Sequence, residues 1–251
     1  MAEITARAGQ LALAGWRGEF RRWEKSPGQI VCELDLEVDE FLKRELCALL
    51  PDAGWLSEET ADDPARLEAR RVWVVDPIDG TRDFVRGRDG WCVSVALVDR
   101  WQVALGVLDA PARGQRWTAA QGEGAALNGR PLAVRPRTAL AGARVPADSL
   151  PRVDQDLVMV AKPNSIALRL AMVAAGEADL VASLRWGNEW DIAAAALIGE
   201  EAGATVTDAL GMALSYNTPT GEAFGILATA PGIHAAALAR LRARAEAALP
   251  R

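Results

Sequence analysis

The sequence predicts an α/β protein, in which an α+β first half is followed by an α/β second half. Apolar residues recur at helical spacing near the start of the chain, and apolar runs rich in β-branched residues follow, separated by turn residues. From residue 156 onward, strand and helix patterns alternate, which is typical of sheets covered by helices. With 251 residues, the chain can form one large domain or two smaller ones that share a core.

In the first half we expect two helices, over residues 3–23 and 35–50, with a loop at 25–29 between them. Asp35 is expected at the start of the second helix. A charged, loop-like stretch with some local helix then covers residues 61–70. The expected strands lie at 72–75, 91–98, 103–110 and 116–120, followed by a short pair around the Asn-Gly turn at 128–129.

In the second half, residues 136–152 are rich in proline and alanine and form the expected crossing between two subdomains, 1–135 and 136–251. Beyond it, strands and helices are expected to alternate. The expected strands lie near 156–161, 178–184, 204–208 and 224–229, and the helices lie near 165–175, 190–202 and at the C-terminal end.

The composition excludes several classes of protein and of chemistry. The net charge of −6 argues against a general nucleic-acid binder, and no apolar run is long enough for a membrane helix. The N-terminal segment lacks the features of a signal peptide, and the three cysteines form no CxxC pair, so we expect reduced thiols in a cytoplasmic protein. The chain has one histidine, His234, which is expected on the face of the last helix. Histidine-rich zinc sites are therefore excluded, and a Ser-His-Asp mechanism would require His234.

The stretch VWVVDPIDGTRDF places Asp76 and Asp79 directly after an apolar strand. Buried carboxylates are costly to desolvate unless something pairs with them, and Mg²⁺ prefers such oxygen ligands. Two metal ions roughly 3.5–4 Å apart can clamp the attacking and leaving oxygens of a displacement at phosphorus. Gly80 and Thr81 are expected to begin a short helix, whose amides can bind phosphate oxygens. The alternative is an ordinary turn in which Asp79 caps that helix.

Two other acidic segments strengthen the metal hypothesis. Glu58 and Glu59 follow the apolar pair Trp55-Leu56, and Asp191 opens a strongly helical run. Each also has an ordinary interpretation, because paired glutamates are usually solvated and aspartate is a favoured helix cap. The three segments together favour one shared site.

The order and type of these segments resemble the inositol monophosphatase superfamily of Mg²⁺-dependent phosphatases. Residues 76–81 (DPIDGT) match its aspartate signature, 57–59 (SEE) match its acidic element, and 190–193 (WDIA) match its second signature. The resemblance covers nearly the whole chain. It implies a layered αβαβα sandwich of the inositol monophosphatase/fructose-bisphosphatase type, with most metal ligands in residues 1–135 and with Asp191 and substrate contacts in 136–251.

The resemblance also implies residue roles. Glu58, Asp76 and the carbonyl of Ile78 would bind a first Mg²⁺, and Asp76, Asp79 and Asp191 a second. Glu58 would also help to hold a third ion, so that two or three ions would be bound.

Thr81 and Asp35 would activate the water that attacks phosphorus, and the resemblance implies a catalytic role for Glu58 as well. Asp79 and the amides of Gly80 and Thr81 would contact the substrate phosphate. The family is also typically lithium-sensitive and dimeric, so we expect a homodimer that acts on a small phosphorylated metabolite.

The identity of the phosphate ester is the remaining question. Inositol-specific members carry a glutamate about seven residues before the Trp-Asp signature, where an ungapped count places Leu184 in this chain. Arg82 and Arg169 lie where the branch that cleaves 3′(2′),5′-bisphosphonucleotides carries basic residues, and Arg169 could contact a second phosphate. Either arginine could equally be a solvated surface charge. We therefore predict a bisphosphate nucleotidase, with the inositol 1-phosphate, other sugar phosphate and histidinol phosphate phosphatases as alternatives.

Two further sequence features bear on function. Trp91 and Trp186 could line the cleft and stack on a base, although most tryptophans pack in cores.

A non-catalytic regulatory protein on the same scaffold would be indicated by the loss of a metal ligand. All four acidic ligands are present, which favours the enzyme.

Overall fold

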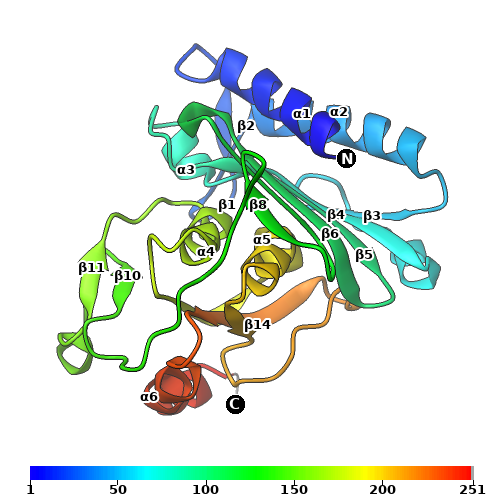
Figure 1. Ribbon diagram of the computed structural model, residues 1–251. Coiled ribbons are helices and arrows are strands. Elements are labelled where there is room, and N and C mark those ends of the chain that lie inside the picture. Colours follow the sequence, from blue (N-terminus) through cyan, green and yellow to red (C-terminus); the bar gives the residue numbers. More distant parts are fainter. Residues whose placement is uncertain (250–251) are drawn as a thin grey trace.

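The computed structural model of the protein describes residues 1–249, which form five layers (Figure 1). Two helices cover one face of a seven-stranded sheet, two more lie between that sheet and a three-stranded sheet, and the last helix covers the far side. This is the αβαβα sandwich that the sequence predicts. The helices are α1 (Ala2–Gly15), α2 (Glu33–Leu49), α3 (Thr81–Phe84), α4 (Ile166–Ala174), α5 (Glu189–Glu201) and α6 (His234–Ala247).

The large sheet has the strand order β3-β4-β5-β6-β7-β8-β9. Only the first pair is parallel, and each later strand is antiparallel to its neighbour, as expected for strands joined by short turns. Its strands are β3 (Gly54–Ser57), β4 (Arg71–Asp79), β5 (Cys92–Asp99), β6 (Gln102–Ala110), β7 (Gln115–Ala120), β8 (Gly124–Leu127) and β9 (Arg130–Pro131).

The remaining strands form three smaller sheets. An antiparallel sheet has the order β12-β14-β13, from Leu180–Asn188, Glu222–Thr229 and Thr205–Thr207. A hairpin is made by β1 (Arg22–Ser26) and β2 (Gln29–Cys32), and a parallel pair by β10 (Arg144–Pro146) and β11 (Val158–Val160). Single 3₁₀ turns lie at Pro64–Glu68, Pro111–Arg113 and Arg152–Asp154.

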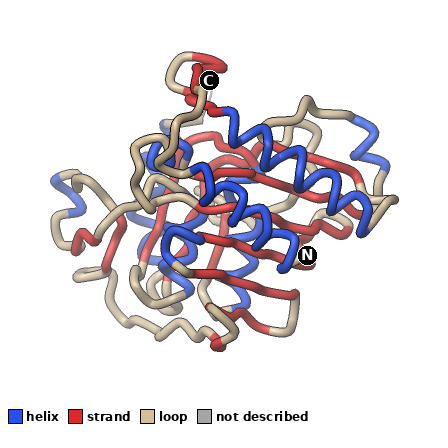
Figure 2. Tube along the Cα trace, turned by 90° about the horizontal axis from the view of Figure 1, so that it is seen from above, coloured by secondary structure: helices blue, strands red, loops and turns tan. Residues whose placement is uncertain are grey.

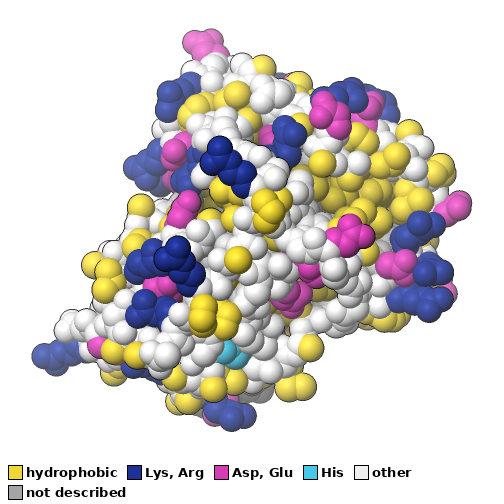
Figure 3. Space-filling model, viewed as in Figure 1, with side chains coloured by type: hydrophobic (Ala, Val, Ile, Leu, Met, Phe, Trp, Pro, Cys, Tyr) yellow, Lys and Arg dark blue, Asp and Glu magenta, His cyan; other side chains and the backbone are white. Residues whose placement is uncertain are grey.

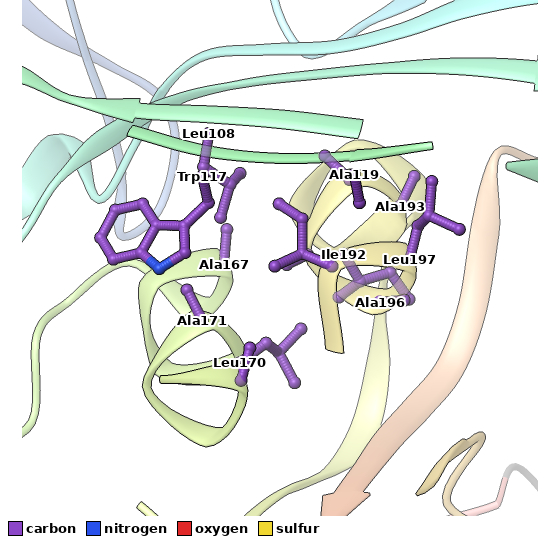
Figure 4. Packing of buried hydrophobic residues seen from close by; sticks show 14 of the residues in the cluster. Leu108, Trp117, Ala119, Ala167, Leu170, Ala171, Ile192, Ala193, Ala196 and Leu197 are labelled. Carbon is purple, nitrogen blue, oxygen red and sulfur yellow. The ribbon is translucent and has the colours of Figure 1, made fainter. Parts of the chain in front are cut away.

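Both faces of the large sheet are buried, because successive side chains of a strand point to opposite sides. Trp73 and Val75 of β4 pack toward α1 and α2, which lie side by side on that face (Figure 2), whereas Val72 and Val74 pack toward α4 and α5. Leu108, Trp117 and Ala119 of the sheet meet the small side chains of α4 and α5 (Figure 4).

Helix α5 is buried along most of its length, since every residue from Ile192 to Gly199 is buried. Alanines make this possible by letting the helix lie close to the sheets. At Gly106 of β6, an added Cβ would lie 2.8 Å from the carbonyl oxygen of Ala194, so this contact requires glycine. The close approach fixes the start of α5, and with it Asp191, relative to the large sheet.

Two expectations about the elements were wrong in detail. The first helix ends at Gly15 rather than at residue 23, because residues 22–26 pair with 29–32 around a turn in which Gly28 has φ 81°. Asp35 does not open α2. The helix starts at Glu33, and Asp35 in its first turn accepts a hydrogen bond from the Cys32 amide. The segment 136–152, whose role as a crossing stays a prediction, contains the short strand β10.

The expected division at residue 135 stays a prediction, although one apolar cluster contains residues from both sides of it, including Val74 and Leu197. No helix within residues 1–249 is long and apolar enough to cross a membrane.

Candidate active site

Three carboxylates from distant parts of the chain meet at one point. Glu58 follows the end of β3, Asp76 lies near the end of β4, and Asp191 lies in the first turn of α5. One carboxylate oxygen of each lies within 4.8 Å of the others. Asp76 is buried, and Glu58 and Asp191 are half-buried. The structure therefore brings together three of the four carboxylates that the resemblance assigns to the metal ions.

The turn after Asp76 is shaped by a hydrogen bond to the Asp76 carboxylate and by the glycine at position 80. The pairing of β4 with β5 is interrupted between Asp76 and Asp79, and the Ile78 amide donates to Asp76 Oδ1 over 3.0 Å. Gly80 has φ 95°, and a Cβ there would lie 2.6 Å from the Gly90 carbonyl oxygen, so only glycine fits. The short helix α3 follows at Thr81, as predicted.

Asp79 lies beside the three-carboxylate cluster and lines the same cavity. The ordinary interpretation, in which Asp79 caps the helix that follows it, is wrong, because Gly80 occupies that position. Asp79 instead accepts hydrogen bonds at Oδ2 from the Ser165 hydroxyl and from the Ala167 amide at 2.7 Å, at the start of α4. This contact ties the end of β4 to the second half of the chain.

Thr81 and Asp35 are also brought together, as the sequence predicts. The Thr81 hydroxyl lies 3.3 Å from Asp35 Oδ1 and 3.0 Å from the carbonyl oxygen of Ile78, so it can donate to either. The other Asp35 oxygen, Oδ2, accepts from the Cys32 amide at 2.8 Å. Asp35 is 1 % exposed, and burial raises its pKa.

Burial and mutual repulsion raise the pKa values of the clustered acids. Burial raises the pKa of Glu58 to about 8, with Asp191 and Glu59 adding to the effect. Burial and then the charge of Asp79 raise the pKa of Asp191 to about 7. The pKa of Asp76 is raised well above its usual range, for burial first and then for the charge of Glu58.

One nearby cation offsets only part of this negative charge. Lys25 of the β1–β2 hairpin pairs with Glu59, and its ammonium lies 3.3 Å from the carbonyl oxygen of Glu58. The cluster therefore offers several hard oxygen ligands, which are the donors that Mg²⁺ prefers. It also carries an excess of negative charge, which a divalent cation would neutralise.

A model of the inositol monophosphatase family matches residues 1–247 of this chain. The chain belongs to that family.

Its relatives and structural neighbours agree with this assignment. The chain is 33 % identical over 216 residues to the fructose-1,6-bisphosphatase/inositol-1-monophosphatase of Thermotoga maritima, and the match covers 82 % of each chain. It is 34 % identical over 200 residues to the Nus factor SuhB of Xylella fastidiosa, covering 74 % of this chain and 71 % of that protein. The solved structure of the Thermotoga maritima IMPase superposes with a TM-score of 0.85 at 29 % identity, covering 99 % of this chain and 97 % of the other.

Members of the inositol monophosphatase family are phosphatases, so the chain is a phosphoric monoester hydrolase. Enzymes of this family use Mg²⁺, and the three-carboxylate cluster fits that ion by its donor chemistry.

The cavity that these acids line has a volume of about 600 Å³. Its lining includes the turn of the β1–β2 hairpin, where Arg82 donates to the Gly28 carbonyl over 2.7 Å. It also includes Lys162, Arg169 and Arg185, which we call the basic wall. The cavity of this phosphatase is thus lined by both acidic and basic side chains.

The two arginines predicted to contact substrate both line the cavity, but each is already engaged. Arg82 donates to the hairpin, and Arg169 donates to the carbonyls of Pro163 and Asn164 just before α4. Both side chains thus hold the cavity wall, and their contact with substrate stays a prediction.

Sequence reasoning missed Arg185. A bulge in β12 places Leu184 and Arg185 opposite Gly225, whose φ of 64° accommodates it. Leu184 packs into the apolar clusters around α6, while Arg185 and Trp186 line the cavity. Counting residues back from the Trp-Asp signature cannot locate such a bulge, although a glycine within the partner strand is a weak signal of one.

The other side chains considered from the sequence lie apart from the cluster. Trp91 is fully buried against Phe84 and does not line the cavity, so of the two possibilities for this residue the structure shows the core position. His234 is half-buried, and its two ring nitrogens contact the hydroxyls of Thr207 and Thr229. Cys32, Cys47 and Cys92 are free thiols.

The raised pKa values predict how the stability of the metal-free protein depends on pH. Between pH 4.5 and about 8 the folded protein keeps protons on Glu58 and Asp191 that the unfolded chain releases. Stability should therefore fall as pH rises through this window in the presence of a chelator, and added Mg²⁺ should remove most of that loss. Thermal unfolding measured from pH 5 to 8 tests this.

Asp76→Asn is the matched variant for this experiment. It keeps the oxygen that accepts from the Ile78 amide but removes one charge, so it should stabilise the metal-free protein at pH 8 by on the order of 1 kcal/mol, or about 2–4 °C. Asp52→Asn, in an exposed turn after α2, is the control. A chelated wild type that is equally stable at pH 5 and pH 8 would contradict the interpretation.

Proposed function

We propose that this protein is a Mg²⁺-dependent phosphomonoesterase whose substrate carries a second anionic group. The observation that carries the proposal is one cavity lined both by the cluster of Glu58, Asp76 and Asp191 and by the basic wall of Lys162, Arg169 and Arg185. The acids suit the ions and the scissile phosphate, and the basic wall suits the remote charge.

For the metal, we assign Glu58, Asp76 and Asp191 as carboxylate ligands, with Asp79 and the Ile78 carbonyl completing two or three ion positions. Asp79 uses only Oδ2 to bind the start of α4, so its other oxygen is available. Bound Mg²⁺ supplies positive charge that stabilises the transition state and lowers the pKa of water.

The remaining chemistry is assigned to side chains of this chain. Thr81 lines the cavity, and when its hydroxyl donates to Asp35, its oxygen can accept a hydrogen bond from the attacking water. The raised pKa of Asp35 makes that carboxylate a better proton acceptor. We also assign Glu58 a part in activating this water, and the amides of Gly80 and Thr81 a part in holding the phosphate at the start of α3. Histidine has no role in this mechanism.

For the substrate we favour a 3′(2′),5′-bisphosphonucleotide. Arg185 is exposed and makes no ion pair within residues 1–249, so it is free to bind a second phosphate. Trp186 is 47 % exposed next to it and offers an indole on which a base can stack. Arg169 supports this site by shaping the same wall.

A sugar phosphate is the second candidate. The Thermotoga maritima relative is named a fructose-1,6-bisphosphatase/inositol-1-monophosphatase, and a Rhizobium meliloti inositol-1-monophosphatase is 32 % identical over 234 residues. Fructose 1,6-bisphosphate also carries two phosphates and would use the basic wall. Inositol 1-phosphate and histidinol phosphate carry one phosphate and would leave Arg185 without an anionic partner.

We also propose the setting in which the enzyme works: a cytoplasmic homodimer, inhibited by lithium, that binds small metabolites rather than nucleic-acid polymers or membranes. On the face drawn in Figure 3, basic side chains are mixed with acidic ones and form no continuous basic surface. A regulatory role without catalysis is disfavoured because the acidic ligands are present.

Phosphate release with and without Mg²⁺ tests the reaction. Wild-type protein should release phosphate from adenosine 3′,5′-bisphosphate only with the ion, and chelation should abolish the activity. Asp191→Asn should lower kcat/KM by more than about 100-fold. Mutating a residue that only hydrogen-bonds to a metal ligand typically lowers activity about 10–100-fold, and removing a ligand itself should cost at least as much. Activity that survives chelation, or an Asp79→Asn variant as active as wild type, would contradict the metal assignment.

Arg185→Ala tests the substrate class. Losing one charge-assisted contact at an exposed position should lower kcat/KM for adenosine 3′,5′-bisphosphate about tenfold and change inositol 1-phosphate turnover by less than about threefold. Arg242→Ala, an exposed change on α6, is the control. Equal losses on both substrates, or a higher wild-type kcat/KM for inositol 1-phosphate, would rule out the nucleotide preference.

A further inference from the structure

A buried polar network joins the two segments that carry Glu58 and Asp191. Its first member is Arg66, which lies in the 3₁₀ turn Pro64–Glu68 shortly after Glu58 and is 2 % exposed. Its guanidinium donates to both carboxylate oxygens of Asp62, at 2.6 and 2.9 Å. A fully buried arginine is rare unless its donors are satisfied, so the remaining contacts define what it holds.

Those remaining contacts cross to the second half of the chain. Arg66 Nη1 donates to Asn217 Oδ1 at 2.6 Å and to the Thr218 carbonyl at 3.0 Å. The Asn217 side-chain amide donates back to the Arg66 carbonyl at 3.2 Å. Asn217 has a φ of 57°, so its backbone is held in a conformation that non-glycine residues seldom adopt.

The same loop is held from its other side by Glu189, the first residue of α5. Glu189 is fully buried, and it accepts from the amides of Asn217 and Thr218 at 2.6 and 2.8 Å and from the Thr218 hydroxyl at 2.6 Å. Its own amide donates to the Gly221 carbonyl at 2.9 Å. A buried carboxylate with this many donors is costly to remove and fixes its surroundings.

Asp191 lies two residues after Glu189 in the same helical turn. Its carboxylate accepts a hydrogen bond from the Asn188 amide over 3.3 Å, at the start of the same helix. The chain of contacts from Asp62 through Arg66, the 217–218 loop and Glu189 therefore sets where Asp191 stands relative to Glu58.

We propose that Arg66 and Glu189 are positioning residues that hold Asp191 in register with Glu58 and Asp76 and so determine how tightly the site binds a divalent cation. The inference rests on the proposed metal site. Neither side chain touches the cavity, and both act through the 217–218 loop and the start of α5. The network joins the segments of two ligands that lie more than a hundred residues apart in the sequence.

The test is Glu189→Gln, with Mg²⁺ binding measured by calorimetry in the absence of substrate. Glutamine has nearly the same shape as glutamate, but it replaces one accepting oxygen with an NH₂ group, which cannot accept from the amides of Asn217 and Thr218. The contact between residue 189 and the 217–218 loop is therefore weakened. The Mg²⁺ dissociation constant should rise about 10–100-fold, as for other partners of metal ligands. The Mg²⁺ concentration for half-maximal activity should rise in parallel, while kcat at saturating Mg²⁺ changes by less than about threefold. Glu222→Gln, an exposed loss of the same charge at the start of β14, is the control.

Thr218→Val is a milder second variant, because it removes the hydroxyl, whose contacts are with Glu189 at 2.6 Å and the Glu222 carbonyl at 3.4 Å, but keeps the amide contact to Glu189. It should raise the dissociation constant by a smaller factor. Its result decides the matter if Glu189→Gln does not fold. Variants that lose thermal stability yet bind Mg²⁺ as tightly as wild type would overturn the proposal, since the network would then be structural only. Wild-type protein that binds no Mg²⁺ would instead overturn the metal site itself.

Discussion

Carboxylates that lie close together away from bulk water repel one another, and the arrangement of this protein depends on how that repulsion is balanced. Glu58, Asp76 and Asp191 lie within 4.8 Å, and burial raises the pKa of each. Apolar packing alone would not hold them together. A bound divalent cation offsets this repulsion, so the three carboxylates can serve as a binding site. Other contacts of the protein hold the three carboxylates in place.

The contacts that hold the acids of the site have a common physical basis, since several of these acids lie at or bind the start of a helix. Asp35 lies in the first turn of α2, Asp191 in the first turn of α5, and Asp79 binds the first amides of α4. Amides and the helix dipole at such ends stabilise negative charge. The tight contact of α5 with Gly106 and the buried Arg66–Glu189 network then fix these helices relative to the sheets. Fold and site are thus specified by the same contacts.

Most strands of the large sheet and most acids of the site could be predicted from the sequence, because the patterns that indicate them lie within short segments of the chain. Apolar runs indicate the strands of the large sheet, acids directly after apolar segments indicate Glu58 and Asp76, and Asp191 stands out because it opens a strongly helical run. The rest depends on pairing between distant segments. The predicted first helix runs into the hairpin at residues 22–32, because β1 is exposed along its whole length and its sequence RWEKS shows no strict alternation of apolar and polar residues. The bulge that presents Arg185 depends on Gly225 in another strand. Likewise, nothing local to Glu189 or Arg66 reveals that one loop joins them.

The central claim is that the three carboxylates are held together for a divalent cation. Anomalous diffraction from crystals soaked in Mn²⁺, which takes the same oxygen ligands as Mg²⁺, tests it most directly. The account predicts a strong peak in contact with carboxylate oxygens of Glu58, Asp76 and Asp191. Crystals that bind Mn²⁺ elsewhere while this cluster stays without a peak would contradict it.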